Sequence, residues 1–423
     1  MEEIKEKVLL AGVDTGTEED YEVCMQELKN LAEACDMQVM GMVTQRLEMA
    51  NKALYIGTGK VAELKELAVQ TDAVLVIFED SLTPSQLRNL QNELNLPVMD
   101  RTNLILDIFA RRAKTREAKL QVEVARLKYL LPRLVGLHDA LSRQGGAGGS
   151  MSSKGAGEKQ LELDRRKIEH RITELSRELE TVSTERQTQR KKRKKSGIPQ
   201  VSLAGYTNAG KSTILNMLVE AYAQDEEKKV LEKDMLFATL ETAVRRIDDG
   251  SKKPFYLADT VGFIHNLPHG LVKAFRSTLE EIREADLIVE VIDYSDVNYK
   301  KHMEVTEKTL QELNAGHIPV IYVYNKADLC MDDIPVQKGN RLYMSAREKK
   351  GMDELIRMIT DTLYADRRET TFFIPYSEGR IVSDLCNRTE VLSQAFIENG
   401  VRLVVKCSES DRNRYVAYRI KEG

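Results

Sequence analysis

The chain has 423 residues, enough for about three domains of ordinary size, and its hydrophobic content of 42% suffices for buried cores. No apolar run approaches the roughly 18 residues of a membrane helix, and the first residues lack the pattern of a secretion signal, which argues against a membrane-spanning or exported protein. Five scattered cysteines without a CxxC pair are typical of a reducing compartment. We therefore expect a cytoplasmic protein without a membrane span.

The net charge of −4 conceals one strongly basic segment. Between Arg101 and Lys195 there are 24 Lys and Arg against 12 Asp and Glu, which is a local charge of +12 and leaves −16 elsewhere. Concentrated positive charge is typical of nucleic-acid binding, although a solvated helix face is the alternative. We interpret the segment as an RNA contact, with these candidate residues: Arg143, Lys154, Arg190, Lys191, Lys192, Arg193, Lys194 and Lys195.

The first 100 residues alternate short apolar runs with amphipathic stretches, which predicts a parallel α/β domain over residues 1–100. The expected strands are 7–13, 37–43 and 73–79, and the expected helices are 20–36, 59–70 and 83–95. The last helix should begin at Thr83-Pro84, an N-cap followed by proline. Gly57-Thr58-Gly59-Lys60 lacks the spacing and the terminal Ser or Thr of a phosphate loop, so we interpret it as a glycine-rich turn.

Residues 101–196 are predicted to form a basic antiparallel helical hairpin. Two sets of apolar residues step by 4, 3, 4 and 3, and these matched heptad seams predict two helices packed together within one chain. The seams are Leu120, Val124, Leu127, Leu131 and Leu134, and Ile168, Ile172, Leu175, Leu179 and Val182. Residues 143–157 between them are glycine-rich and are expected to form an irregular tip loop. Since one chain supplies both sides of the seam, the free protein is expected to be a monomer.

A phosphate loop follows. Gln200–Ala204 has the composition of a buried strand and runs into the pattern GxxxxGK[ST], after which Thr213–Glu220 has the pattern of a helix. The loop is expected to bind phosphates through backbone N–H groups, with Lys211 reaching the β- and γ-phosphates and the Ser212 hydroxyl on Mg²⁺. The predicted nucleotide-binding residues here are Gly205, Tyr206, Thr207, Asn208, Ala209, Gly210, Lys211, Ser212 and Thr213.

Three further motifs indicate guanine. Asp259-Thr260-Val261-Gly262 matches DxxG, in which Asp259 would hold Mg²⁺ and the Gly262 N–H would face the γ-phosphate. Asn325-Lys326-Ala327-Asp328 follows an apolar strand, and the Asp328 carboxylate could accept both N1–H and N2–H of guanine, a donor pair that adenine lacks. Ser345-Ala346-Arg347 would offer the Ala346 N–H to the base carbonyl. These motifs predict a GTPase domain over residues 197–366 with a doubly wound, mostly parallel sheet.

The four motifs in this order resemble the TRAFAC class of GTPases, whose Mg²⁺-binding threonine lies between the phosphate loop and DxxG. That resemblance implies Thr239 as the catalytic threonine, with Thr242 as the competitor. Between about residues 8 and 365 the chain also contains these stretches: AGVDTG, ALYIGTGK, LSRQGG, GAGEKQLELDRR, LFATLET and DTVGFIHNLPHGLVKAFRSTLEE. Together they resemble, more specifically, the HflX family of ribosome-associated GTPases. The tip loop, GGAGGSMSSKGAGE, departs from the family's tighter pattern of glycine and arginine.

The HflX resemblance implies a factor that binds the large ribosomal subunit and its rRNA and promotes ribosome dissociation or rescue. GTP hydrolysis to GDP would reset it, and the protein would be partly associated with ribosomes or peripherally with membranes. The alternative is an rRNA remodeller or helicase whose N-terminal region binds ATP as well. Tight ATP binding by residues 1–195 would favour that alternative.

Phe263 stands after DxxG, where small regulatory GTPases carry a glutamine that orients the attacking water. Phenylalanine can neither donate nor accept a hydrogen bond, so we expect slow hydrolysis by the free protein and stimulation by ribosomes. His265 and His269 are candidate substitutes, with a polar switch residue as the alternative for both. Asn208 stands where potassium-activated GTPases coordinate a monovalent cation, which suggests K⁺ besides Mg²⁺.

Residues 367–423 are predicted to form a small α+β domain without a catalytic cluster, for which a docking role is the default. Its expected elements are strands 372–375, 391–397 and 401–406, a helix over 378–388 and a hairpin turn at Asn399-Gly400.

Overall fold

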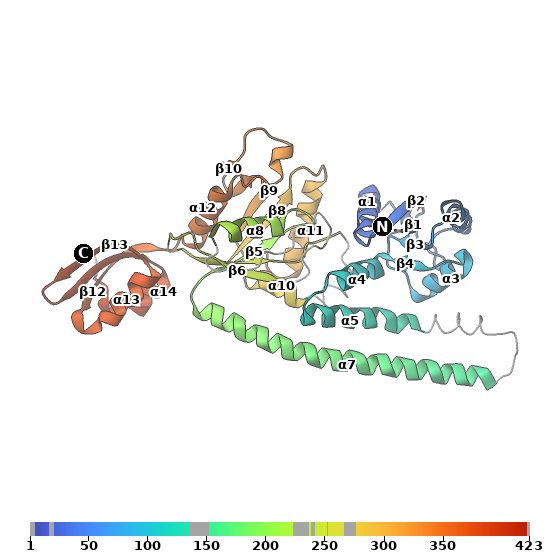
Figure 1. Ribbon diagram of the computed structural model, residues 1–423, viewed down its shortest axis with the longest axis horizontal. Coiled ribbons are helices and arrows are strands. Elements are labelled where there is room, and N and C mark those ends of the chain that lie inside the picture. The colour runs from blue at the N-terminus through green and yellow to red at the C-terminus, as the bar shows by residue number, and fades with distance from the viewer. Residues whose placement is uncertain are drawn as a thin grey trace. The chain divides into compact units, whose positions relative to one another are not determined.

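Figure 1 shows the chain as a computed structural model. The structure describes residues 5–16, 21–134, 152–222, 237, 242–251, 253–265 and 276–420, without the side chains of 152–161, 189, 192, 194, 195 and 276–279. These residues form two compact units. The first holds the chain up to Arg190 together with Phe237, Ile264 and His265, and the second holds the phosphate loop and the C-terminal region.

The N-terminal part is a four-stranded parallel sheet in the order β2-β1-β3-β4. The apolar run of β1 is buried along its centre, as expected for a parallel strand covered on both faces. Helix α1 packs with α4, and α2 packs with α3. The elements are β1 Glu6–Asp14, α1 Tyr21–Ala34, β2 Met37–Arg46, α2 Thr58–Thr71, β3 Leu75–Phe78, α3 Pro84–Leu94, β4 Val98–Asp100 and α4 Arg101–Arg112.

The predicted start of α3 is confirmed. The Thr83 hydroxyl accepts from the Gln86 N–H at 3.2 Å, the Gln86 side chain accepts from the Thr83 N–H at 3.0 Å, and Pro84 occupies the first turn. This reciprocal pair satisfies two N–H groups that a helix start otherwise leaves without partners.

The helical hairpin consists of α5 (Arg116–Leu130), followed by the short turn η1 (Leu131–Arg133), and α7 (Ser152–Lys195). The heptad prediction is confirmed by an apolar cluster of residues from both helices: Leu120, Val124, Leu127, Leu175 and Leu179. Three ion pairs cross the seam and fix its antiparallel direction: Glu123–Arg171, Arg116–Glu178 and Glu117–Arg186, each at 3.0 Å. The first two pairs are exposed and contribute at most about 1 kcal/mol each, and the third is half-buried, so the apolar cluster is expected to dominate.

The predicted extent of the tip loop is wrong at its C-terminal end. Helix α7 begins at Ser152, whereas the glycine content favoured an irregular loop as far as Gly157. A glycine costs a helix only about 1 kcal/mol relative to alanine, so a long helix already formed downstream can extend through two of them. Arg143 lies outside the described residues, and the side chain of Lys154 is not described.

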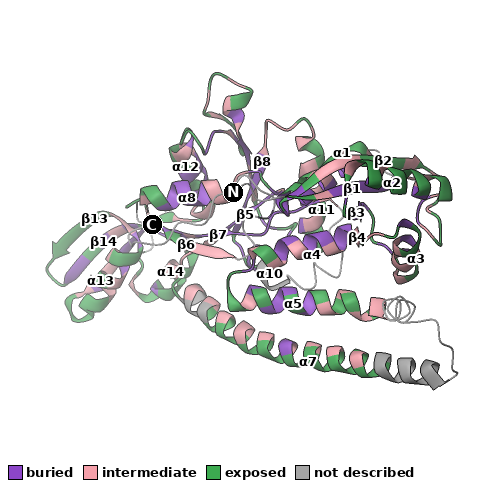
Figure 2. Cartoon of the chain, turned by 45° about the vertical axis from the view of Figure 1, so that its right-hand side comes forward, coloured by how far each residue is buried: buried purple, intermediate pink, exposed green. Residues whose placement is uncertain are grey.

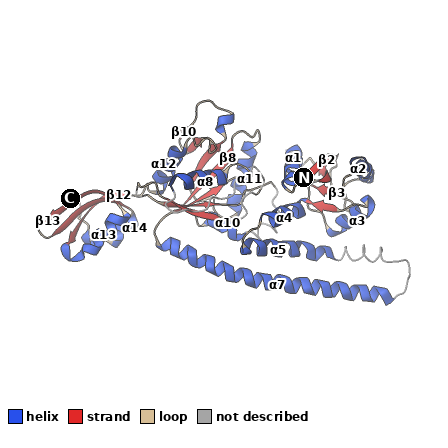
Figure 3. Ribbon diagram, in the orientation of Figure 1, coloured by secondary structure: helices blue, strands red, loops and turns tan. Residues whose placement is uncertain are grey.

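The second unit contains a seven-stranded sheet in the order β10-β11-β9-β8-β5-β7-β6, parallel except at its two edge strands. The predicted doubly wound, mostly parallel sheet is confirmed. The strands are β5 Gln200–Ala204, β6 Ala243–Ile247, β7 Phe255–Asp259, β8 Leu287–Asp293, β9 Val320–Asn325, β10 Val336–Lys338 and β11 Arg341–Tyr343. The helices are α8 Lys211–Tyr222, α10 Arg276–Arg283, α11 Tyr299–Glu312 and α12 Met352–Leu363, with the short turn η2 Ala327–Leu329. Figure 3 shows the strands enclosed by these helices.

The C-terminal part is a three-stranded antiparallel sheet in the order β12-β14-β13, as the sequence suggested. Phe372, Leu403 and Leu385 are fully buried between the sheet and its helices, whereas most of β13 is exposed, as Figure 2 shows. The elements are β12 Arg368–Pro375, η3 Tyr376–Glu378, α13 Gly379–Arg388, β13 Glu390–Ile397, β14 Gly400–Cys407, α14 Glu409–Arg414 and η4 Val416–Tyr418.

A carboxyl group lies inside the GTPase domain. Glu290 on β8 is 3% exposed, and its Oε1 has no hydrogen-bond partner within the described part of the chain. Burial, aided by the nearby Glu307 carboxylate, raises the pKa of Glu290 from its ordinary 4.5 to about 8. The folded state therefore keeps a proton that the unfolded chain releases, and stability falls as the pH rises from 4.5 to 8.

Glu290→Gln is therefore expected to raise the free energy of unfolding at pH 8 by about 2 to 4 kcal/mol, with much less change at pH 5. Urea unfolding at the two pH values measures the difference. Glu307→Gln is the control, because Glu307 is the exposed one of these two neighbouring glutamates. It should change the free energy of unfolding by less than about 1 kcal/mol. An equal effect of Glu290→Gln at both pH values would contradict this account.

Candidate nucleotide-binding site

The phosphate loop connects β5 to α8 and needs glycine at two positions. Gly205 has φ +136°, and a Cβ there would lie 2.2 Å from the Val291 carbonyl oxygen of β8. Gly210 has φ +98°, and a Cβ there would lie 2.2 Å from Nδ2 of Asn325. A side chain at Gly205 would push the loop away from β8, and one at Gly210 would push it away from Asn325 at the end of β9.

Lys211, the first residue of α8, is 6% exposed. Its ammonium donates to the carbonyl oxygens of Gly205 at 2.9 Å and Tyr206 at 2.6 Å. Burial lowers the pKa of Lys211 to about 8, and the Asp259 carboxylate opposes this shift. The ammonium is thus protonated at neutral pH and lies in a site of low polarity, where its attraction for a phosphate is strong.

Ser212 and Asp259 form a pair of oxygen donors. The Ser212 hydroxyl donates to Oδ2 of Asp259 at 2.7 Å, at the carboxyl end of β7. Mg²⁺ prefers oxygen ligands and usually keeps several waters alongside one or two side chains and substrate phosphates. Two such oxygens at the end of a phosphate loop fit that preference. No cluster of three or more His, Cys, Asp or Glu side chains suited to a metal occurs among the described residues.

The segment after DxxG pairs directly with the phosphate loop. Thr207 donates its N–H to the Phe263 carbonyl at 2.8 Å, and Phe263 donates to the Gly205 carbonyl at 3.1 Å. A Cβ on Gly262 would lie 2.8 Å from the Thr207 Cα and 3.0 Å from Nζ of Lys211. Gly262 therefore lies against the end of the loop where Lys211 is placed, and the Phe263 side chain is 2% exposed.

Asn325 holds the base-recognition loops together. It is 3% exposed, its Nδ2 donates to the Ala209 carbonyl at 2.9 Å, and its Oδ1 accepts from the Ala346 N–H at 2.9 Å. Asn325 thus links the phosphate loop to the Ser345–Arg347 loop rather than only facing a base, as the motif alone suggested. Lys326 adopts φ +59°, and its ammonium lies 2.7 Å from Oδ2 of Asp293.

The other predicted residues of this site surround the same end of the sheet. Asp328 lies in η2 and is half-buried, next to Ala327, whose N–H donates to the Met344 carbonyl at 3.1 Å. Ser345 is buried, Arg347 and Asn208 are exposed, and Thr213 is half-buried in the first turn of α8. Thr239 and His269 lie outside the described residues, and Thr242 directly precedes β6.

Two residues that sequence reasoning missed support the site. The His302 imidazole on α11 stacks on the Tyr206 ring, with centroids 3.9 Å apart and 11° between the planes. Asp293 ends β8 and holds Lys326. Asp293 could have been predicted as a site residue, because ligands bind at the carboxyl ends of the strands in such sheets and Asp293 ends a central strand. Nothing in the sequence pairs His302 with Tyr206, because 96 positions separate them.

His265 contacts two residues of the first unit, Arg101 and Cys24. Its carbonyl accepts from Nη2 of Arg101 at 2.9 Å, and its Nδ1 lies 3.5 Å from the Cys24 sulfur. Arg101 is 3% exposed and pairs with Glu27 and with Glu79, the latter at 3.4 Å. His265 therefore does not have the free side chain that a water-positioning residue needs.

The candidate RNA-contact residues at the end of α7 differ in their exposure to solvent. Arg193, for which the sequence offers no acidic neighbour, lies 3.2 Å from Oε1 of the buried Glu281. A carboxylate 88 positions away in the sequence therefore partners Arg193, and its contact with RNA stays a prediction. Lys191 is exposed and Arg190 is half-buried, while the side chains of Lys192, Lys194 and Lys195 are not described.

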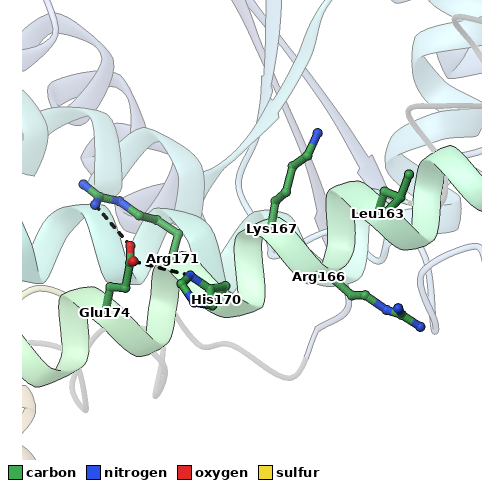
Figure 4. A pocket seen from close by; sticks show the side chains of 6 residues that line it. All are labelled: Leu163, Arg166, Lys167, His170, Arg171 and Glu174. Atoms are coloured by element: carbon green, nitrogen blue, oxygen red, sulfur yellow. Dashed lines mark ion pairs between the residues drawn. The ribbon is translucent and has the colours of Figure 1, made fainter.

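Further along α7, basic side chains line a shallow hollow of the helix surface (Figure 4). Arg166 and Lys167 are exposed there, and Glu174 pairs with His170 at 3.4 Å and Arg171 at 3.6 Å. These pairs are exposed and therefore contribute little to stability.

The sequence Gly57-Thr58-Gly59-Lys60 is no second phosphate loop. Gly57 is the N-cap of α2 with an extended backbone, its N–H donates to Gln45 at 2.8 Å, and Lys60 lies 2.7 Å from Glu63 one turn on. The segment is an ordinary helix start, close to the turn that we expected. None of the described helices has the length and apolar character needed to cross a membrane.

Three family profiles match successive parts of the chain. Residues 22–110 match one described as GTP-binding GTPase N-terminal, residues 112–193 match GTP-binding GTPase Middle Region, and residues 200–326 match 50S ribosome-binding GTPase.

Relatives match over almost the full length. The GTPase HflX of Caldanaerobacter subterraneus subsp. tengcongensis is 44% identical over 98% of this chain and 95% of its own length. The GTPase HflX of Escherichia coli is 40% identical over 89% of this chain and 87% of its own. A crystal structure of a GTP-binding protein from the archaeon Sulfolobus solfataricus in complex with GDP is 22% identical, covers 86% of this chain and 99% of that one, and has a TM-score of 0.43.

Proposed function

Because this chain belongs to the HflX family of GTPases, we propose that it binds the large ribosomal subunit and promotes ribosome dissociation or rescue, with GTP hydrolysis resetting the factor. The observation that carries the proposal is the match of residues 200–326, which include the phosphate loop and DxxG, to a profile described as 50S ribosome-binding GTPase. The chain itself is a GTPase.

The site residues are proposed in these roles. Lys211 binds the β- and γ-phosphates, Ser212 and Asp259 hold Mg²⁺ with Thr239, and Asp328 reads the base. Mg²⁺ would neutralise charge on the phosphates. The Ser212–Asp259 hydrogen bond of 2.7 Å supports this assignment, because it holds the two oxygens next to each other.

Hydrolysis by the free protein is proposed to be slow. Phe263 offers no polar atom to a water, and its backbone is bonded to the phosphate loop through Thr207 and Gly205. A partner that rearranges this segment would speed the reaction, and we propose that the large subunit is this partner. The basic hairpin, with a local charge of +12, is the proposed rRNA contact.

Potassium is proposed as a second cation. Asn208 is exposed and adopts φ +62°, so its amide oxygen is accessible beside the phosphate loop. GTPase rates with large subunits should be higher in KCl than in NaCl, and Asn208→Ala should remove the difference. Equal rates in the two salts would argue against a potassium site.

Subunit splitting tests the proposed role in dissociation. Purified 70S ribosomes are mixed with the protein and either GTP, a non-hydrolysable GTP analogue or GDP, and the subunits are separated on sucrose gradients. We expect free subunits with GTP and with the analogue, and few with GDP. Intact 70S ribosomes under all three conditions would contradict the dissociation role without affecting the assignment of a GTPase.

A further inference from the structure

Thr207, the third residue of the phosphate loop, carries a buried hydroxyl to which the contacts described so far assign no role. The residue is 7% exposed, and its Oγ1 has no hydrogen-bond partner in the described parts of the protein. Leaving a buried hydroxyl without a partner costs roughly 1 to 3 kcal/mol. Such a cost at a functional loop indicates a partner that arrives with the substrate.

Thr207 lies beside Gly262, which is expected at the γ-phosphate end of the site. A Cβ on Gly262 would lie 2.8 Å from both Cα and Cγ2 of Thr207 and 3.0 Å from Nζ of Lys211. The lysine of a phosphate loop reaches the β- and γ-phosphates, and the glycine of DxxG faces the γ-phosphate. The base end is elsewhere, where Asn325 bonds to Ala209 and Ala346.

The site lacks the usual group for orienting water. Phe263 occupies the position after DxxG, and its ring has no polar atom. Its main chain is occupied as well, because the Phe263 carbonyl accepts from Thr207 at 2.8 Å and its N–H donates to Gly205. The Thr207 main chain is therefore hydrogen-bonded to the residue that stands in place of the glutamine.

We propose that the Thr207 hydroxyl is a catalytic residue that accepts a hydrogen bond from the attacking water and so substitutes for the missing glutamine. This inference rests on the GTPase reaction of the proposed function and names the group that orients its nucleophile. The water oxygen bonds to the γ-phosphorus as the bond to the β,γ-bridging oxygen breaks. GDP leaves with the electron pair, and the water's proton ends on the released phosphate. Thr207 keeps its own proton throughout.

The test compares Thr207→Val, which keeps the shape but removes the hydroxyl, with Thr207→Ser, which keeps the hydroxyl. Thr207→Val should lower kcat by roughly 10- to 100-fold with KM for GTP changed less than about twofold, and Thr207→Ser should stay within about threefold of the parent. Binding of GDP with aluminium fluoride should weaken in Thr207→Val, whereas binding of GDP alone should not. Thr306→Val is the matched control, because its buried hydroxyl already bonds to the His302 carbonyl at 2.9 Å.

Three outcomes overturn the proposal. An unchanged kcat in Thr207→Val removes the catalytic role, and a raised KM with unchanged kcat assigns the hydroxyl to ground-state binding of the γ-phosphate. An equal loss of kcat in the valine and serine variants indicates that Thr207 acts through packing and not through its hydroxyl. Affinity for GDP shows whether each variant is folded. If Thr207→Val loses that affinity, the kcat of Thr207→Ser is compared with the kcat of Thr207→Ala instead, and the same criteria apply. All rates are measured with and without large subunits. A lack of stimulation by ribosomes counts against the proposed function. The ratio of the variant and parent rates without ribosomes still tests the role of Thr207.

Discussion

Lys211→Ala is expected to lower kcat/KM for GTP by on the order of 1000-fold, the largest effect of any single change proposed for this chain. The ammonium is buried and protonated at neutral pH, so it attracts phosphate oxygens without competition from bulk water. In the structure it donates to the Gly205 and Tyr206 carbonyls, at 2.9 and 2.6 Å, so the same group also holds the backbone of the phosphate loop. Steady-state GTPase assays and GDP titrations measure the loss.

Lys60→Ala is the control for this change, since it removes the lysine of the other Gly-Lys sequence. Lys60 is partly exposed and paired with Glu63 at 2.7 Å, so its loss should change GTP hydrolysis less than about twofold. A comparable loss in both variants would mean that GTP turnover also depends on the N-terminal domain.

Asp328→Asn is expected to change the preferred base from guanine to xanthine. A carboxylate accepts two hydrogen bonds and suits the N1–H and N2–H of guanine, whereas an amide accepts one and donates one, which suits N1–H and the C2 carbonyl of xanthine. GTP should lose at least about 100-fold in kcat/KM, while xanthosine triphosphate becomes the better substrate. Competition between the two triphosphates measures the change.

Asp332→Asn, an exposed aspartate shortly after the same motif, should leave base preference unaltered. If Asp328→Asn lowered turnover of both triphosphates equally, the residue would hold the loop and not read the base. Asn325 illustrates that alternative, because its amide is bonded to Ala209 and Ala346.

The elements with strong local patterns could be predicted from the sequence. The apolar run Gln200–Ala204 is β5, and the leucine spacing around Leu120 and Leu175 placed two helices in contact. Both patterns act over a few residues, and burial of one face is enough to explain them. The phosphate loop was equally clear, because its glycines serve a backbone geometry that other residues cannot adopt.

Contacts between distant positions could not be predicted. Arg193 meets Glu281, His302 stacks on Tyr206, and Glu290 is buried in a strand that otherwise reads as apolar. Each of these depends on which elements become neighbours in the folded chain, and one sequence carries little information on that. The helix start at Ser152 was missed for another reason, since local glycine content was given more weight than the length of the helix that follows.

GTPase rate with and without purified large ribosomal subunits is the measurement that tests the central claim most directly. A chain with Phe263 in place of a glutamine should hydrolyse GTP slowly alone and at least about 10-fold faster with saturating subunits, by analogy with other GTPases that need a partner. The stimulation should disappear in Lys211→Ala and should not appear with small subunits. An equal rate with and without large subunits would contradict a GTPase switched by the ribosome.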